Sequence, residues 1–287
     1  MLGHVLAECG LDPLCVNGAN VPGWEGAVRF GDGAYAVAEV DESDRSLVAF
    51  SPYAAVVTNA SADHYSKEEM DEVFDAFIRD CAGPVVDGRK DGDADLGQWV
   101  TPLPGRHNLQ NAALAARMAL ALGCGAEDVR RALANFRGVN RRLQLISDAA
   151  SNVTVYDDYA HNPEKIRAMW ETLAEKYPQG ICVIWRPHGF GPLRKLLEPL
   201  AEMFSTTVRV QDRLLLLPVY DAGGTAFRGI NAPDLAARIR HDRVTLVRSH
   251  EEAFGWCLLH ACEFGAFVTC GARDPELPQL ARRLAAL

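Results

Sequence analysis

The pattern of apolar and polar positions along the chain changes near residue 140. Beyond that point, short apolar runs alternate with segments whose apolar side chains recur at helical spacing. The runs expected to form strands are LQLIS, VTVYDD, GICVIWR, TTVRVQ, RLLLLPVY, RVTLVR and AFVTC, and helices are expected to begin near Pro163, Pro192, Ala232, Glu251 and Pro275. This alternation predicts βαβ units, and therefore a mostly parallel sheet with helices on both faces.

The first 140 residues predict a less regular mixture of helices and strands. In the segment 67–81, Met70, Val73, Phe74 and Phe77 share one helical face. Further helices are expected at 1–9, HNLQNAALAARMALALG and AEDVRRALANF, and strands at YAVAEV (35–40) and AAVVTNA (54–60). The glycine- and aspartate-rich stretch GPVVDGRKDGDADLGQ is typical of a turn or an exposed loop.

Length and composition narrow the class of protein. At roughly 150 residues per domain, a chain of 287 residues fits two compact domains or one large α/β unit. Because no apolar run approaches the ~20 residues of a membrane span and the start lacks a basic signal region, we expect a cytoplasmic protein that does not bind membranes. The net charge of −9 disfavours nucleic acid as a partner. The eight scattered cysteines contain no CxxC pair, which disfavours a zinc ribbon or a disulfide framework.

Glu39 and His64, at or after the ends of two expected strands in the first half, are candidate metal ligands. Glu39 belongs to the end of the first strand, and His64 follows the second. If these strands are neighbours in a parallel sheet, their carboxyl ends bring the carboxylate and the imidazole together as a site for a divalent cation. The alternative is a set of acidic surface loops without a ligand.

Two further segments are candidates for nucleotide binding. His107, Asn108 and Asn111 begin an alanine-rich helix, and the two amides share a face that suits a purine edge, while the helix N-terminus favours anions. Alternatively, Asn108 is a simple N-cap. In NRRLQL, Arg141 and Arg142 are either phosphate ligands or solvated charges of a linker.

The second half carries polar residues after two expected strands. VTVYDD ends in Asp157 and Asp158. His161 follows, just before Pro163 begins a helix. Two carboxylates and a histidine in such a loop form a candidate ligand site, because capping the helix needs only one of them. GICVIWR likewise leads into RPHGFGPLRK, which contains His188.

Six motifs, in their order along the chain, resemble the Mur ligase family. They are AEVDESDRSL, Pro52-Tyr53 followed by VVTN and ADH, GRHNLQN, FRGVNRR, DDYAHNPE and RPH. Each motif alone is weak, whereas six in register from Met1 to about Ala272 are specific. The resemblance is greatest to the branch that adds L-alanine to UDP-N-acetylmuramate in peptidoglycan synthesis.

The resemblance implies an α/β fold in two parts. Residues 1–140 would be a truncated, parallel-sheet central domain of the ATPase type, and residues 141–287 a Rossmann-like C-terminal ligase domain that binds the amino acid. The implied activity is that of an ATP-dependent amide ligase. ATP would phosphorylate a substrate carboxylate, the amine of an amino acid would attack the acyl phosphate, and a tetrahedral intermediate would expel phosphate. Metal ions and arginines suit this chemistry because they neutralise phosphate and oxyanion charge.

The resemblance also assigns residues in the first half by position. Glu39 and His64 would hold Mg²⁺. Asn108 and Asn111, with His107 close by, would contact the adenine of ATP.

In the second half, the resemblance assigns Arg142 to the terminal phosphate of ATP. Asp158 would contact the ribose or the hinge between the domains. His161 and His188 would face the amino acid and the acyl phosphate, so that Arg142, His161 and His188 are the expected catalytic residues.

Three features depart from the family pattern. No GKT or GKS occurs in the chain, so the phosphate loop GxxGKTT expected before the first helix is missing, as is the domain that holds the UDP group. The passage from Cys81 to Pro104 is short, which predicts a reduced central sheet. Gly189 and Pro192 stand where the alanine-adding branch carries arginines. We therefore expect this chain to be part of a longer ligase and to have no turnover by itself.

Two other functions stay open at this stage. One is a non-catalytic, Mur-like protein that retains a nucleotide or peptide pocket, which predicts a stable folded chain with its own start at Met1. The other is an unrelated α/β protein whose acidic loops bind a metal for hydrolysis.

Overall fold

The computed structural model describes residues 1–40, 46–59, 67–147, 150–223 and 227–287. These residues divide into two compact units, Met1–Val139 and Asn140–Leu287. Each unit has its own core and is described by itself. Within the described ranges, no helix is both long enough and apolar enough to cross a membrane.

The second unit is built on a mixed sheet in the order β10-β9-β8-β11-β7-β6. Its strands from β10 to β7 pair in parallel, and β6 pairs with β7 in antiparallel. The expected, mostly parallel sheet is therefore confirmed. The strands are β6 (Gln144–Leu145), β7 (Val155–Asp158), β8 (Ile181–Trp185), β9 (Arg213–Leu216), β10 (Val244–Leu246) and β11 (Ala266–Cys270).

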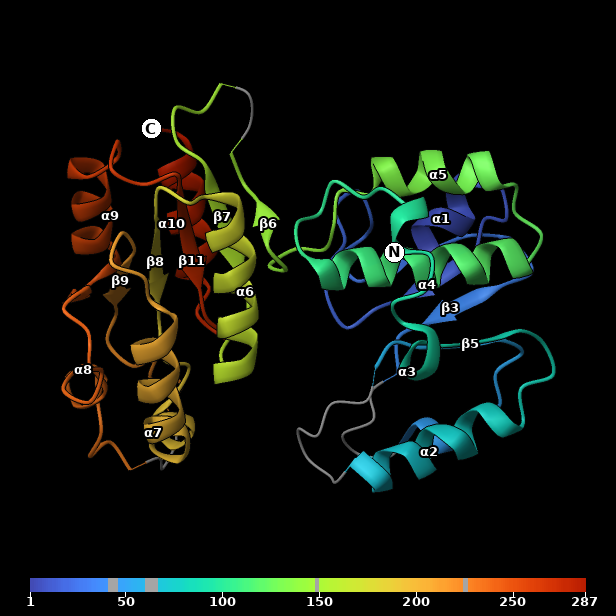
Figure 1. The fold of residues 1–287 in the computed structure, drawn as a ribbon, viewed down its shortest axis with the longest axis horizontal. Coiled ribbons are helices and arrows are strands. Elements are labelled where there is room, and N and C mark those ends of the chain that lie inside the picture. Colours follow the sequence, from blue (N-terminus) through green and yellow to red (C-terminus); the bar gives the residue numbers. More distant parts are fainter. Residues whose placement is uncertain (41–45, 60–66, 148–149, 224–226) are drawn as a thin grey trace. The chain divides into compact units, whose positions relative to one another are not determined.

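Helices cover both faces of this sheet (Figure 1). Along β8, Val183 faces one buried cluster, whereas Cys182 and Ile184 face the other, as the two-residue period of a strand requires. The first cluster is completed by α6, α7 and α8, and the second by α9 and α10. These helices are α6 (Pro163–Lys176), α7 (Phe190–Thr207), α8 (Ala232–Ala236), α9 (His250–Leu259) and α10 (Glu276–Ala285).

The first unit packs its helices around an alanine-rich core. Ala112, Ala113, Ala116 and Ala119 are buried on α4, where their small side chains let α1 and α5 approach closely. Strand β1 pairs with β2 in antiparallel and with β3 in parallel, while β4 pairs with β5 in parallel. The elements are α1 (Leu2–Glu8), β1 (Leu14–Val16), β2 (Val28–Arg29), β3 (Ala36–Ala38), a 3-10 helix (Ser46–Ala49), β4 (Ala55–Val57), α2 (Lys67–Arg79), β5 (Val85–Asp87), α3 (Gly88–Asp91), a second 3-10 helix (Leu96–Gln98), α4 (Arg106–Ala121) and α5 (Ala126–Asn135).

Two predictions of local structure were wrong. TTVRVQ is not a strand, because α7 continues to Thr207 and the chain then turns, with the Asp212 carboxylate accepting hydrogen bonds from the backbone of Arg209 and Ile181. The stretch expected to be a loop contains β5 and α3. Pairing with β4 orders β5, and the Asp87 side chain caps α3 by accepting from the backbone N–H of Arg89.

Candidate functional site

The carboxyl ends of three strands in the second unit carry the candidate site. In the sheet, β11 lies between β8 and β7, and its last residue, Cys270, is aligned with Trp185 on one side and Asp158 on the other. His161 and His188 each lie three residues beyond these ends. Their rings meet edge to face with centroids 4.9 Å apart. The structure therefore brings together two histidines that are 27 residues apart in sequence.

Local interactions fix the His161 loop. The Asn162 side chain accepts a hydrogen bond from the backbone N–H of Lys165, and Pro163 occupies the first turn, so α6 begins two residues after His161. The His161 Nδ1 lies 3.0 Å from the carbonyl oxygen of Tyr159. Because a carbonyl only accepts, Nδ1 carries the proton of the neutral ring and Nε2 keeps the lone pair.

Both histidines are biased towards the neutral form. Burial lowers the pKa of His161, and the nearby cations Lys165, Arg142 and Arg273 lower it further. Burial, the His161 ring and Arg273 lower the pKa of His188 to about 4. At neutral pH these rings therefore offer hydrogen-bond acceptors next to a region of positive charge.

Asp158 lies at the end of β7 and is buried, with 7% of its surface exposed. Its two carboxylate oxygens accept hydrogen bonds from the backbone N–H groups of Leu143 and Ala160, at 2.6 and 2.7 Å. Burial nevertheless raises its pKa to about 6, and the charge of Asp157 contributes to this rise. Asp158 thus holds the segment that enters the unit against the loop that leads to His161.

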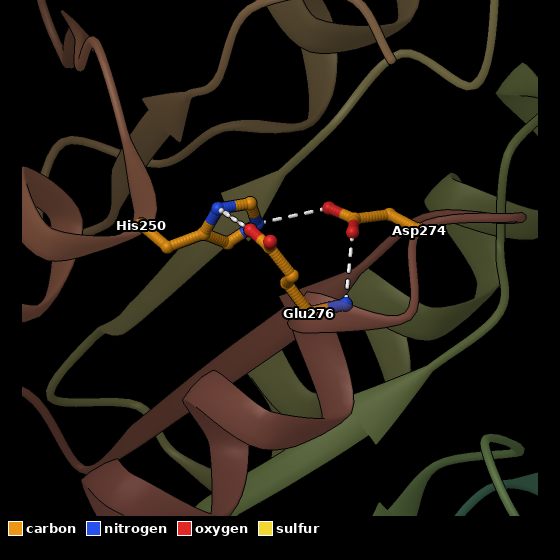
Figure 2. Close-up of side chains that lie close together, drawn as sticks. All are labelled: His250, Asp274 and Glu276. Carbon is orange, nitrogen blue, oxygen red and sulfur yellow. Dashed lines mark hydrogen bonds and ion pairs between the residues drawn. The ribbon is translucent and has the colours of Figure 1, made fainter. Parts of the chain in front are cut away.

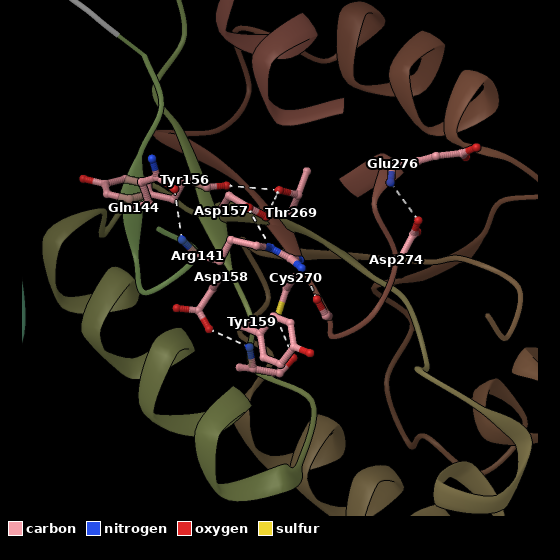
Figure 3. Close-up of polar contacts among 12 residues, drawn as sticks. Arg141, Gln144, Tyr156, Asp157, Asp158, Tyr159, Thr269, Cys270, Asp274 and Glu276 are labelled. Carbon is pink, nitrogen blue, oxygen red and sulfur yellow. Dashed lines mark hydrogen bonds and ion pairs between the residues drawn. The ribbon is translucent and has the colours of Figure 1, made fainter. Parts of the chain in front are cut away.

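The neighbouring Asp157 is used within the protein (Figure 3). Arg141 forms an ion pair with it, with 3.0 Å between Nε and Oδ2, and the hydroxyl of Thr269 donates to the other oxygen. Arg141 also donates to the carbonyl oxygen of Gly271 and packs over the Tyr159 ring. The predicted ligand function of Asp157 therefore gives way to a structural one.

The two arginines at the boundary consequently have different environments. The Arg141 guanidinium is engaged by partners in the sheet, whereas Arg142 is exposed and lies within electrostatic range of His161 and Asp158. Of this pair, Arg142 is free to meet a ligand. The structure thus places Arg142, Asp158, His161 and His188 at the same edge of the sheet.

A network of charges that we did not predict from the sequence lies beside this edge (Figure 2). Asp274 is 1% exposed. Its Oδ2 lies within hydrogen-bond distance of both Arg186 Nη1, at 2.7 Å, and His250 Nε2, at 2.9 Å. The second ring nitrogen of His250 lies 2.8 Å from a Glu276 oxygen. His250, Asp274 and Glu276 each offer one ligand atom within 4.8 Å of the others. However, the two carboxylates face opposite ring nitrogens and Arg186 occupies Asp274, so the arrangement is an ion-pair network rather than a cation site.

A narrow cleft adjoins the two histidines. Both rings line it together with the apolar side chains of Pro192, Leu193 and Leu196. Trp185 also lines the cleft, and its buried indole N–H has no hydrogen-bond partner among the described residues. The space among these side chains is too small to hold a water molecule.

The first unit contains the candidate metal ligands. The Glu39 carboxylate is exposed and accepts a 2.7 Å hydrogen bond from the backbone N–H of Gly18. His64 lies outside the described residues. The condition that their strands be neighbours is not met among the described residues, where β3 pairs with β1 and β4 with β5. These short strands each pair with another partner, which the local pattern does not specify.

The expected adenine contacts lie on the first turns of α4. Asn108 is not an N-cap, because Gly105 occupies that position and the Asn108 amide donates to the carbonyl oxygen of Pro104 at 2.7 Å. Its own oxygen stays available. Asn111 is half-buried one turn further along, and His107 is exposed.

The chain is similar to known proteins along most of its length. Residues 141–273 match the family model described as Mur ligase, glutamate ligase domain. The UDP-N-acetylmuramate--L-alanine ligase of Gloeobacter violaceus is 31% identical over 337 residues, which cover 99% of this chain and 71% of that protein. The ligase of the same name from Nostoc punctiforme is 31% identical over 292 residues, covering 85% of this chain and 60% of that protein. The chain therefore spans about 60% of the length of several such relatives.

Solved structures agree with this assignment at the level of the fold. The UDP-N-acetylmuramate-alanine ligase of Thermotoga maritima superposes with a TM-score of 0.76 at 23% identity, over 99% of this chain and 70% of that chain. The folylpolyglutamate synthase of the same organism gives a TM-score of 0.66 at 14% identity, over 99% of this chain and 83% of that chain. These likenesses confirm the α/β fold class. The 31% identity to a relative of which 71% is covered shows that the chain belongs to the Mur ligase family.

Proposed function

We propose that this chain forms the nucleotide-binding and amino-acid-binding parts of an ATP-dependent amide ligase that joins L-alanine to UDP-N-acetylmuramate. The observation that carries the proposal is the convergence of Arg142, His161 and His188 on one sheet edge in a member of the Mur ligase family. Residues 1–139 would then be the nucleotide-binding domain and residues 140–287 the amino-acid-binding domain, as the two compact units suggest.

The second unit has the groups that the amide-forming step needs. An amine attacks an acyl phosphate only in its neutral form, so it must lose a proton. The Nε2 of His161 holds a lone pair and is suited to accept that proton, while His188, with a pKa of about 4, is suited to accept a hydrogen bond. The exposed Arg142 guanidinium is suited to form bidentate hydrogen bonds with phosphate oxygens.

The first unit offers groups that fit a nucleotide and its metal. When bound, ATP supplies the phosphoryl group and Mg²⁺ neutralises the charge of the phosphates. The exposed Glu39 carboxylate is a hard oxygen donor that suits Mg²⁺. The Asn111 amide and the oxygen of Asn108 suit the donor and acceptor edge of adenine, with His107 next to them.

Binding of ATP and magnesium by the 287-residue chain tests the nucleotide part of the proposal. By calorimetry, we expect Asn111→Ala to weaken binding about fivefold, because one hydrogen bond contributes about 1 kcal/mol. Glu39→Gln keeps the acceptor for Gly18 but removes the charge, and we expect it to abolish the gain in affinity that magnesium gives. Asn135→Ala and Glu72→Gln, at exposed positions of α5 and α2, are the matched controls. No binding at millimolar ATP would contradict this part of the proposal.

Turnover separates the ligase from the non-catalytic alternative. The chain is mixed with ATP, magnesium, UDP-N-acetylmuramate and L-alanine, and both phosphate release and amide formation are measured. Because the sequence contains no GKT or GKS, we expect ATP binding without turnover from this chain alone. Arg142→Gln in a chain extended to the length of the relatives is then expected to abolish amide formation. If the extended chain binds ATP but forms no amide, the non-catalytic alternative holds.

A further inference from the structure

Arg273 occupies the middle of the candidate site, although no motif singled it out. Cys270 is aligned with both Asp158 and Trp185, and the residues three positions beyond these ends are Arg273, His161 and His188. Since β11 lies between the other two strands, the Arg273 loop emerges between the two histidine loops. The three residues therefore follow adjacent strand ends at equal spacing, on loops at the same edge of the sheet.

The backbone of Arg273 is held in an unusual conformation. Its φ angle is +65°, in the left-handed region that residues other than glycine rarely adopt. The next residue, Asp274, is held by three hydrogen bonds to its carboxylate. One comes from Arg186. The others come from His250 and from the backbone N–H of Glu276 (Figure 2). Such strain persists where the surroundings over-determine it, which is common at binding sites.

The charge of Arg273 is available, as is that of Arg142, whereas two other arginines near this edge are engaged. Arg141 is engaged by Asp157, and Arg186 by Asp274. Arg273 is exposed, and its guanidinium has no ion pair or hydrogen bond with the rest of the described chain. Its charge lowers the pKa of both His161 and His188, which places it within electrostatic range of both rings.

The segment directly after His188 carries no cation. The residues that follow His188 are glycine, phenylalanine, glycine and proline. The site therefore offers two kinds of group, neutral ring nitrogens and free guanidinium groups. An α-amino acid has the two complementary groups, an amine and a carboxylate.

We propose that Arg273 binds the carboxylate of the incoming amino acid and thereby selects an acceptor with a free α-carboxylate. The proposal rests on the proposed ligase function and adds the residue that recognises the acceptor. With the carboxylate on Arg273, the amine of the same molecule lies towards the histidine rings.

Histidine ring signals in NMR spectra of the 287-residue chain provide the test. L-alanine, L-alaninamide and inorganic phosphate are titrated separately while the His161 and His188 signals are followed. We expect L-alanine to shift both rings at concentrations at least tenfold below those needed for L-alaninamide. Arg273→Gln is expected to remove this preference, and Arg273→Lys to restore part of it. The reason is that a cationic side chain favours the carboxylate of L-alanine over the neutral amide of L-alaninamide.

Controls separate recognition from folding and from the parent proposal. Arg248→Gln removes the same charge at the end of β10, three strands away from β11, and is expected to leave the preference intact. Arg273→Gly accepts a φ of +65° without strain, so its loss of the preference is not attributable to misfolding.

Three outcomes overturn the proposal: equal binding of alanine and alaninamide, unchanged binding in Arg273→Gln, or inorganic phosphate that displaces alanine and depends on Arg273 in the same way. ATP-magnesium calorimetry on Arg273→Gln is run in parallel. If the carboxylate preference depends on Arg273 but no variant binds ATP, the amino-acid site stands and the ligase proposal fails. If ATP binds but alanine does not, only the Arg273 proposal fails.

Discussion

At the scale of single residues, the site depends on charges whose environments differ sharply over short distances. Arg141 and Arg142 are adjacent, yet one is engaged in the sheet and the other is exposed. Asp157 and Asp158 are also adjacent, and one pairs with a guanidinium while the other binds backbone N–H groups. Such pairs cannot be assigned by residue type, so substitutions must test them separately.

Asp158 predicts a pH dependence of stability. Its folded pKa of about 6 lies above the ordinary value of 3.8, so the folded state retains a proton that the unfolded state releases. The free energy of unfolding should therefore fall as the pH rises from about 4 to 6, by about 2 to 3 kcal/mol for this group. Urea denaturation at pH 4 and pH 7 should show this fall reduced in Asp158→Asn and unchanged in the exposed Asp242→Asn. An equal fall in all three proteins would contradict the prediction.

Arg273 predicts a gain in stability on removal. A left-handed conformation costs a residue other than glycine about 1 kcal/mol or more. Arg273→Gly should therefore raise the free energy of unfolding by about 1 kcal/mol, measured by urea denaturation. The same change at Arg248, which lacks a positive φ, should give no gain. A loss of stability in Arg273→Gly would show that the side chain contributes more than the strain costs.

Arg273 also affects the titration of its neighbour. Burial is the main reason that the pKa of His188 is lowered to about 4, and the charges of His161 and Arg273 add to it. Replacing the guanidinium by an amide should move the pKa of His188 part of the way back towards 6.5. An NMR titration of Arg273→Gln should therefore show a higher His188 pKa than in the unmodified chain, and an unchanged value would place the guanidinium away from the ring.

At the scale of elements, one carboxylate joins the end of β8 and the starts of α9 and α10. Burial by itself raises the pKa of Asp274, but hydrogen bonds from His250 and Arg186 lower it to about 2. A depressed folded pKa stabilises the protein above the ordinary value near 3.8, and this contribution disappears as the pH falls through about 2. The size expected from the shift is about 2 to 3 kcal/mol.

Asp274→Asn should therefore destabilise the second unit at pH 7 by about 2 to 3 kcal/mol. The difference from the unmodified chain should shrink as the pH approaches 2, which urea denaturation at both pH values measures. Asp242→Asn, an exposed aspartate of the same unit, should change stability by less than about 0.5 kcal/mol. A difference that persists at low pH would assign the effect to packing rather than to charge.

At the scale of the whole molecule, the two units differ in how their sheets are built. The second unit has a sheet with a large apolar cluster on each face. In the described part of the first unit, the strands form separate small sheets of three and two strands. Short sheets with unpaired edges bury less apolar surface and leave more backbone groups to water.

Limited proteolysis of the intact chain should therefore cleave the first unit sooner. We expect a resistant fragment close to residues 141–287, identified by mass spectrometry, while fragments of residues 1–139 do not accumulate. Addition of ATP and magnesium should slow cleavage of the first unit if it binds the nucleotide. Equal resistance of both units would contradict the difference in stability.

The sequence by itself determined the secondary structure of the second unit closely, because period-two and helical patterns are local properties. It also placed His161 and His188 after strand ends, where parallel sheets gather ligands. Short elements were less determined: β5 is ordered by pairing with β4, and TTVRVQ was a wrong strand because α7 continued into it.

Only the tertiary structure decided which of these residues meet. The register of β11 with β7 and β8 aligns the strand ends that precede Arg273 and the two histidines, and Asp274 meets Arg186 across 88 positions of the chain. It also showed that β3 and β4, the strands next to Glu39 and His64, pair with other strands. Local periodicity fixes what each segment becomes, whereas strand pairing and buried charge depend on partners distant in sequence, whose identity no local pattern contains.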